Sequence, residues 1–250
     1  MMSLRREGIG DLYHQETKYR REAMPRGGLQ WAHQPSPHKE FPYALQHFPL
    51  HPPMEKGGRP IWEAMAKRRS IREFSRDPIT FLELSQLIWS TQGITSREWG
   101  IEFRATPSAG ALYPIETYII ANRIETIPSG LYHYHPKKVQ LILLKEGLLG
   151  PDLQYAAMGQ EMLEGAACIF IWTAMVDRSK WKYRERAYRY IYMDVGHIGQ
   201  NLYLAATAMN LGCCTVGAFF DDEVDRILGI DGREEISVYL GAIGRIGQDF

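Results

Sequence analysis

The order of apolar and polar positions divides the chain into alternating helices and strands. The pattern Thr80-Phe81-Leu82-Glu83 is a capping box, and apolar residues follow it at helical spacing up to Gly93, which predicts a helix. The continuous apolar run from Cys168 to Met175 is typical of a strand in a sheet that is covered on both faces. Further helices are predicted around residues 60–65, 153–163, 185–210 and 221–228, and further strands at 115–122, 131–135, 139–144, 213–220 and 236–243.

The longest helical stretch, from near Glu185 to Asn210, is unusual in its pattern. Apolar or aromatic residues occupy nearly all of its circumference between Tyr190 and Met209, and Gly212 marks its end. A helix that is apolar all round is buried on every side. We therefore expect a central helix that also packs against a partner subunit.

Residues 1–58 show little sustained periodicity and are rich in proline and histidine, whereas residues 59–250 carry the regular pattern. Aromatic residues such as Phe41 and Phe48 indicate that the first segment wraps a folded body, because disordered segments normally lack them. The sequence thus predicts an irregular N-terminal wrapping segment, 1–58, and one folded domain, 59–250.

Scattered histidines offer no convincing metal site. His133 and His135 share one face of a predicted strand, a spacing that fits a ligand pair, but no third ligand is near in sequence. We expect a half-exposed sheet face there and no bound metal. His197, one helical turn after Asp194, is interpreted as a buried histidine with a polar partner, although an oriented acid or base is the alternative.

Charge and cysteine content narrow the class of protein. The chain has 29 Lys+Arg and 29 Asp+Glu, so its formal net charge is zero, which speaks against broad binding of nucleic acid or of an anionic membrane. Three cysteines, two of them adjacent, form neither a disulfide framework nor a Cys-x-x-Cys metal pattern. The longest nearly apolar run, residues 166–176, is too short for a membrane helix, and no signal stretch is recognised. These features predict a cytoplasmic protein.

Two stretches carry candidate chemistry. Arg68-Arg69-Ser70-Ile71-Arg72-Glu73-Phe74 has three guanidinium groups and a hydroxyl, which together match the oxygens of a phosphate. The alternative is that these cations only complement the end of the preceding helix. The small residues of the loop from Arg104 to Pro114 leave backbone groups accessible to the edge of a flat ligand, although an ordinary tight connection has the same composition.

The order of four parts of the chain resembles that of the nitroreductase superfamily of FMN-dependent oxidoreductases. These parts are the two stretches above, the long helix that ends at Leu211-Gly212, and the closing Gly244-Arg245. The stretches 181–184, 186–190 and 194–202 are similar to the branch of SagB-type dehydrogenases, which includes oxidases that convert azoline rings of ribosomal peptides into azoles. The resemblance implies an α+β fold: a mixed, mostly antiparallel sheet flanked by helices, with the long central helix in a homodimer core.

The resemblance also implies a cofactor site at the homodimer interface. Arg68, Ser70 and Arg72 would hold the phosphate and ribityl chain of FMN, with Arg69 nearby and Arg245 closing the phosphate site. The loop would reach the flavin from the other subunit, and backbone N–H groups of Gly217 and Ala218 would lie near the reactive edge of the ring. The loop residues implied in this contact are Pro107, Ser108, Ala109, Gly110, Ala111 and Leu112.

In an azoline-type oxidation a hydride leaves to the flavin while a base removes a proton from the neighbouring atom. Lys182 and Tyr183 match a Lys-Tyr pair associated with catalysis in the azole-forming branch. Either group needs a pKa lowered from about 10 to act as a base near neutral pH, and the basic residues around them are expected to favour an ionised tyrosine. From composition alone, a solvated helix start remains the alternative for this stretch.

Three functions follow from the sequence. The first is an FMN-dependent dehydrogenase or oxidase of the SagB type that acts on a peptide-derived or other C–N substrate, which a partner protein would deliver if it is a ribosomal peptide. The second is a nitro- or quinone reductase that uses NAD(P)H. The third is a flavin-binding or scaffold subunit without turnover. The first is the prediction, because the Lys-Tyr pair favours it.

Overall fold

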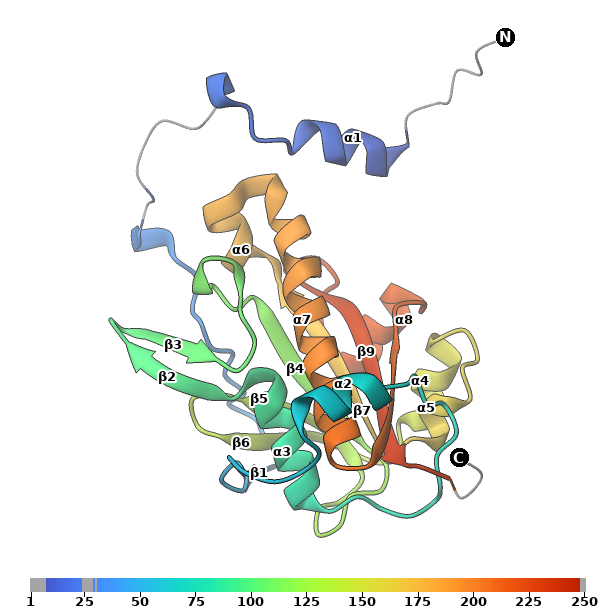
Figure 1. Cartoon of the computed structure of the whole chain (residues 1–250). Helices are drawn as coiled ribbons and strands as arrows, with labels where there is room; N and C mark the ends of the chain where they lie inside the picture. The colour runs from blue at the N-terminus through green and yellow to red at the C-terminus, as the bar shows by residue number, and fades with distance from the viewer. Residues whose placement is uncertain (1–7, 24–28, 30, 248–250) are drawn as a thin grey trace.

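The computed structural model describes residues 8–23, 29 and 31–247, and Figure 1 shows the path of the chain. Helices are α1 (Ile9–Glu16), α2 (Ile61–Lys67), α3 (Phe81–Gln92), α4 (Gly150–Ala156), α5 (Met162–Gly165), α6 (Val176–Tyr183), α7 (Ala187–Ala208) and α8 (Asp221–Leu228), with short 3-10 turns η1 (Arg21–Ala23), η2 (Trp31–His33), η3 (Ala109–Ala111) and η4 (Arg184–Arg186). Strands are β1 (Gln46–Pro49), β2 (Ile94–Glu98), β3 (Ile101–Arg104), β4 (Ile115–Ala121), β5 (Gly130–His135), β6 (Gln140–Glu146), β7 (Cys168–Met175), β8 (Leu211–Val216) and β9 (Glu235–Arg245).

Seven strands form one sheet in the order β1-β6-β5-β4-β7-β9-β8, and each neighbouring pair is antiparallel. At its centre, β4 pairs with β7 from Ile115 opposite Ala174 to Ala121 opposite Cys168. A parallel contact occurs as an isolated bridge between Ile79 and Ile124, and β2 and β3 form a separate hairpin. The predicted α+β fold with a mostly antiparallel sheet is confirmed.

The central strand β7 separates two apolar layers, as its continuous apolar sequence predicts. Phe170 and Trp172 belong to the cluster that includes residues of α3 and α7, whereas Ile169 and Ile171 belong to the cluster that includes residues of α4, α5 and α8. Successive residues of a strand point to opposite faces, so both faces must be covered. Figure 1 shows α7 lying along one face, with α2 crossing it.

Two predicted elements have different bounds in the structure, and one helix was not predicted. The helix expected over 153–163 is two short helices, because Met158 and Gly159 both adopt positive φ angles, 58° and 76°, that interrupt it. The strand expected from Cys213 to Phe220 ends at Val216, and residues 217–220 form a loop. Helix α6, which precedes α7, was not predicted as a separate element.

Within one chain, helix α7 buries a single face rather than its whole circumference. Ile191, Val195 and Ile198 are buried, while Tyr192 and Met193 are 55% and 54% exposed. The burial expected on every side is therefore not met inside the protomer, and contact with a partner subunit stays a prediction. No helix in the described ranges is long and apolar enough to cross a membrane.

The N-terminal segment contacts the sheet in two ways. Strand β1 adds to the sheet edge beside β6, and residues before it lie on the adjacent face. The ring of Phe41 lies 4.7 Å from that of His133, and the ring of His38 stacks 5.4 Å from that of His135. His133 and His135 are consequently buried, so the expectation of a half-exposed sheet face is wrong.

Candidate functional site

The basic cluster that follows α2 lies against the C-terminal half of α7. The hydroxyls of Ser70 and Tyr203 are 2.9 Å apart, and the guanidinium of Arg68 lies 5.3 Å from the centre of the Tyr203 ring. The N–H of Ile71 donates to the carbonyl of Cys213, which holds the cluster beside β8. Tyr203 also accepts a hydrogen bond of 3.0 Å from the N–H of Thr215. Tyr203 therefore positions Ser70, a role that the sequence pattern did not reveal.

The donor groups of this cluster suit a phosphate. Arg69 and Arg72 are exposed, and the guanidinium of Arg69 donates only to the carbonyls of Ala66 and Arg68 among the contacts that the structure describes. No carboxylate of a described residue forms an ion pair with Arg68, Arg69 or Arg72. Unpaired guanidinium groups beside a hydroxyl fit the oxygens of a phosphomonoester such as that of FMN.

Arg245 differs from Arg68, Arg69 and Arg72 because it forms an ion pair with a carboxylate. Two nitrogens of its guanidinium donate to the two carboxylate oxygens of Glu83, each at 2.9 Å, and a third donates to the carbonyl of Pro78. Burial alone would raise the pKa of Glu83, but hydrogen bonds from Thr80 and Arg245 lower it. The carboxylate of the predicted capping box thus holds the residue that the family resemblance assigns to the phosphate.

The loop of small residues is fixed to α7 by one buried acid. Asp194 accepts a hydrogen bond of 2.5 Å from the hydroxyl of Ser108 and one of 3.1 Å from the N–H of Ala109. Burial raises the pKa of Asp194, and these two hydrogen bonds act in the opposite direction. His197, in contrast, is exposed, so the prediction of a buried histidine there is wrong.

Backbone conformation in this loop is strained. Ala111 and Tyr113 have φ angles of 54° and 47°, a region that residues with a Cβ rarely occupy, whereas glycine adopts the φ of 64° at Gly110 readily. The hydroxyl of Ser108 accepts from the N–H of Tyr113 at 3.0 Å and helps to hold this geometry. Strained residues of this kind cost about 1–3 kcal/mol each and concentrate at functional sites. Pro107 and Gly110 are exposed at the surface of the loop.

Lys182 and Tyr183 meet the loop at Gly110. A Cβ placed on Gly110 would lie 2.7 Å from Nζ of Lys182 and 2.5 Å from Oη of Tyr183, so both polar groups touch this residue. Burial raises the pKa of Tyr183, and Tyr190 and Asp194 raise it further. The expectation that nearby cations favour an ionised Tyr183 is therefore wrong. The structure brings the predicted pair to the predicted loop.

Tyr190, which the sequence pattern did not single out, is a tyrosine beside this pair whose pKa is lowered. Its ring centre lies 4.5 Å from that of Tyr183. Burial alone would raise the pKa of Tyr190, but hydrogen bonds with Tyr19 and Arg186 lower it. The spacing of Arg186 and Tyr190, one helical turn apart, is the signal that predicts such a contact.

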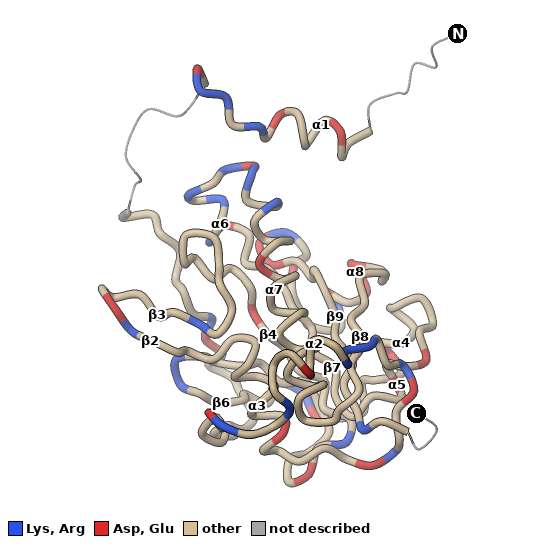
Figure 2. The backbone as a smooth tube through the Cα atoms, viewed as in Figure 1, with Lys and Arg blue, Asp and Glu red and all other residues tan. Residues whose placement is uncertain are grey.

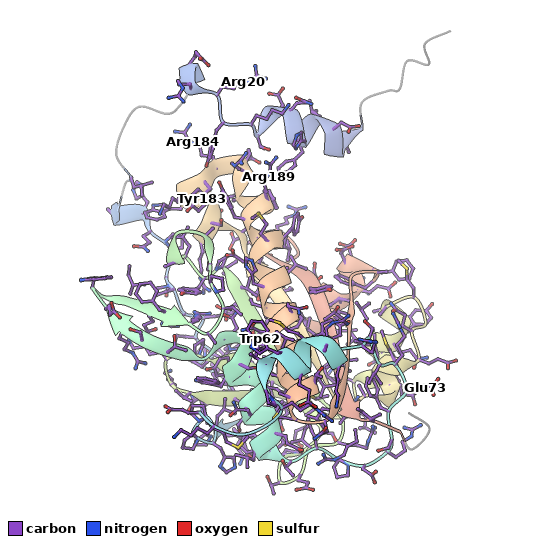
Figure 3. The ribbon with its side chains drawn as sticks, viewed as in Figure 1. Arg20, Trp62, Glu73, Tyr183, Arg184 and Arg189 are labelled. Carbon is purple, nitrogen blue, oxygen red and sulfur yellow. The ribbon has the colours of Figure 1, made fainter. Side chains whose placement is uncertain are left out.

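Helix α1 lies over the corner formed by α6 and α7. The hydroxyl of Tyr13 accepts from the N–H of Arg189 at 2.8 Å, and a guanidinium nitrogen of Arg186 donates to the carbonyl of Thr17 at 2.6 Å. Figure 2 shows basic residues gathered at this corner, and Figure 3 shows Arg20, Arg184 and Arg189 close to Tyr183.

A buried ion pair attaches helix α6 to strand β4. A guanidinium nitrogen of Arg178 lies 2.5 Å from one oxygen of Glu116, and Nε2 of His133 lies 2.7 Å from the other. Nε of Arg178 donates to the carbonyl of Ser36 at 2.7 Å. Burial would raise the pKa of Glu116, but His133 and Arg178 hold it well below its ordinary value.

Gly217 and Ala218 follow β8 in an exposed loop. Neither N–H donates a hydrogen bond to another residue within the described part of the chain, while the carbonyl of Ala218 accepts from Gln160. These two N–H groups are thus available to an acceptor, as the family resemblance implies. Among the described residues, no group of three or more His, Cys, Asp or Glu side chains has an arrangement that fits a metal ion.

Comparison with known proteins identifies related sequences. The chain is 36% identical over 183 residues to the nitroreductase-family protein MJ1384 of Methanocaldococcus jannaschii, covering 73% of this chain and 89% of that protein. It is 24% identical over 206 residues to the microcin B17-processing protein McbC of Escherichia coli, covering 76% of each.

Solved structures show the same fold. A nitroreductase-family structure from Anabaena variabilis superposes with a TM-score of 0.78 at 28% identity, over 95% of this chain and 46% of that longer chain. A family structure from Desulfovibrio desulfuricans, solved in complex with FMN, has a TM-score of 0.52 at 19% identity, over 76% of this chain and 88% of that chain. The nitroreductase family model itself matches residues 65–245, so the chain belongs to the nitroreductase family.

Proposed function

We propose that this protein is an FMN-dependent oxidoreductase of the SagB type that removes a hydride and a proton from a peptide-derived or other C–N substrate. One observation carries the proposal: Lys182 and Tyr183 both touch Gly110, inside the loop that the family resemblance assigns to the flavin. A reductase that only passes electrons from NAD(P)H to a quinone needs no such base at this place. The relationship to a microcin-processing protein supports a peptide-derived substrate.

The residues present fit FMN at two places. Arg68, Ser70 and Arg72 would bind the phosphate, and the N–H groups of Gly217 and Ala218 would donate to the ring system. When bound, FMN supplies a two-electron acceptor for hydride. Arg245 contributes less than the other arginines, because Glu83 already engages two nitrogens of its guanidinium fork.

Proton removal falls to the pair beside the loop. Because burial raises the pKa of Tyr183, its hydroxyl keeps its proton at neutral pH and serves as a hydrogen-bond donor that orients the substrate. We assign acceptance of the substrate proton to the amine of Lys182. Gly110 leaves room for both groups, since any Cβ there would collide with them.

We infer that two copies of the chain complete the site. The exposed face of α7, with Tyr192 and Met193, and the exposed apolar residues of α2, with Trp62 at 77% exposure, form an apolar surface that suits a homodimer interface. Figure 3 labels Trp62 on α2 where that helix crosses α7. A separate partner protein would deliver a ribosomal peptide, and a cytoplasmic location fits this role.

An absorbance titration with FMN tests the cofactor. We expect flavin bands with the purified protein and their loss in a variant that combines Arg68→Ala with Arg245→Ala. Arg68→Ala alone should weaken FMN binding more than Arg245→Ala alone. A wild-type protein that takes up no FMN contradicts the proposal.

A second experiment distinguishes the reactions. Lys182→Met combined with Tyr183→Phe should abolish dehydrogenation of an azoline-containing peptide while FMN binding remains. The matched control combines Lys180→Met with Tyr188→Phe, a lysine and a tyrosine that contact each other on α6 and α7, and it should retain activity. Two results together would favour the reductase alternative. The wild type would show no dehydrogenation of the peptide, and the Lys182 and Tyr183 variant would still reduce a quinone with NAD(P)H.

A further inference from the structure

A cavity of about 510 Å³ lies beside the loop, on the side of Ala111 and Leu112. Its walls come from residues 34–38, from the end of the β2–β3 hairpin and from the loop, and the figure shows that hairpin projecting next to the loop (Figure 1). Small-molecule sites commonly have volumes of about 300–1,000 Å³. The cavity is thus large enough for a ligand of its own.

Arg104 is the unusual side chain of this cavity. It is only 9% exposed, its guanidinium donates to the amide oxygen of Gln92 at 3.2 Å, and it stacks 4.7 Å from the ring centre of Tyr113. Neither partner carries a negative charge. No carboxylate of a described residue forms an ion pair with Arg104, and its buried Nε has no hydrogen-bond partner among those residues.

Of the other charged residues that line the cavity, Arg178 and Glu102 are engaged in ion pairs, whereas Lys137 is exposed. Arg178 is paired with Glu116, and Glu102 is paired with His38 and Arg97. A buried cation without a carboxylate in direct contact is costly, because its hydration is lost without an ion pair in return, and Glu116 acts on Arg104 only from beyond ion-pair distance. Burial lowers the pKa of Arg104, yet a guanidinium stays charged in proteins. Arg104 therefore offers a place for the negative charge of a ligand.

His38 supplies the opposite kind of group. Its Nε2 lies 2.9 Å from a carboxylate oxygen of Glu102, and since a carboxylate only accepts, Nε2 must donate. Burial lowers the pKa of His38, which favours the neutral ring. In that ring Nδ1 is an acceptor, and it has no hydrogen-bond partner among the described residues. A ligand with an N–H group would complement it.

We propose that this cavity binds an N-acylated amino acid or the C-terminal residue of a peptide, with the carboxylate on Arg104 and the amide N–H toward His38. Pro35, Ile101 and Leu112 provide apolar surface for the ligand's side chain. The cavity and the Lys182–Tyr183 pair share one loop, because Ala111 lines the cavity and Gly110 touches the pair. The idea that this ligand is the substrate rests on the proposed function, whereas the prediction that the ligand binds in this cavity does not.

Calorimetric titration of the FMN-loaded protein with N-acetylphenylalanine tests the proposal, and N-acetylphenylalaninamide serves as the neutral analogue. We expect the acid to bind at least about tenfold more tightly than the amide, and Arg104→Gln to remove that difference. Arg226→Gln, an exposed arginine of α8 that does not line the cavity, is the matched control and should bind the acid as the wild type does. A longer peptide that ends in phenylalanine separates the two sources: binding equal to that of the short acid assigns the cavity to peptide C-termini, and weaker binding assigns it to free acylamino acids.

Equal binding of acid and amide, no binding of the acid, or full binding by Arg104→Gln would overturn the proposal. Circular dichroism and FMN uptake check that the variant is folded. If Arg104→Gln does not fold, Ile101→Trp is used, because the indole fills the cavity from its rim and should abolish binding of the acid. Acid binding by Ile101→Trp at wild-type affinity would also overturn the proposal. Failure of FMN to bind would refute the proposed function while leaving this measurement interpretable on the protein without FMN.

Discussion

Replacing Glu116 with glutamine removes the charge that holds two buried basic side chains. The carboxylate is 4% exposed and contacts Arg178 at 2.5 Å and His133 at 2.7 Å. The Glu116→Gln substitution would keep the shape of the side chain but leave the Arg178 guanidinium, also 4% exposed, without a counter-charge. We expect loss of stability together with a looser attachment of α6, which carries Lys182 and Tyr183.

The size of the effect follows from the burial of the pair. Removing one partner of a buried ion pair costs about 3–5 kcal/mol, because the remaining charge is desolvated and unpaired. For a chain of 250 residues, each kcal/mol corresponds to about 2–4 °C in the melting temperature. Glu116→Gln should therefore melt roughly 6–20 °C below the wild type, which follows from the same two magnitudes.

Thermal unfolding followed by circular dichroism measures this difference, and Glu63→Gln is the matched control. Glu63 also contacts two basic residues, Arg59 and Lys67, but at the surface. We expect Glu63→Gln to melt close to the wild type. A Glu116→Gln protein that melts within about 2 °C of Glu63→Gln, the shift of a single kcal/mol at most, would refute the reasoning.

The pH dependence of this difference has a definite sign. The pKa of Glu116 is lower in the folded protein than in the unfolded chain, where a glutamate titrates near about 4.3. A lowered carboxyl pKa stabilises the fold fully above the unfolded value, and the stabilisation is lost as pH falls through the folded value. The gap between wild type and Glu116→Gln should thus be constant near neutral pH and shrink below about pH 4.

Three further changes test separate parts of the site. Thr80→Ala removes the capping hydroxyl that accepts from the N–H of Glu83, and denaturant unfolding should show a loss of about 1 kcal/mol. Gly110→Ala places a Cβ 2.5 Å from the hydroxyl of Tyr183 at a φ of 64°, so dehydrogenation of an azoline-containing peptide at saturating FMN should fall sharply. Tyr203→Phe removes the hydroxyl beside Ser70 and should weaken FMN binding about two- to tenfold, the equivalent of one net hydrogen bond; an unchanged affinity would exclude a positioning role.

Much of the fold was predictable because its signals are local. The capping box of α3 is a contact between residues three apart, and it forms as predicted between Thr80 and Glu83. The continuous apolar run of β7 indicates directly that both faces of this strand are buried. The break between α4 and α5 has only one weak signal, Gly159, because Met158 carries no sequence signal for a positive φ angle.

The candidate site was predictable only where a short sequence motif contains the residue types that its chemistry requires. The arginine cluster, the small-residue loop and the Lys-Tyr pair each stand out in the sequence, and the structure brings the last two together at Gly110. The partners that orient them are distant along the chain and have no motif. Glu83 holding Arg245 and the burial of His133 beneath Phe41 depend on tertiary packing, which periodicity does not encode.

Helix α7 explains why one buried acid is retained among apolar side chains. Asp194 is disfavoured by burial, as its raised pKa shows, yet it satisfies Ser108 and Ala109 of a strained loop. Tyr203, nine residues later and thus about 14 Å along the same helix, holds Ser70 of the basic cluster. Since a helix moves as a rigid element over this length, α7 fixes the spacing between the loop and the cluster. The cost of one desolvated carboxylate is therefore offset by a fixed position of the loop relative to the cluster.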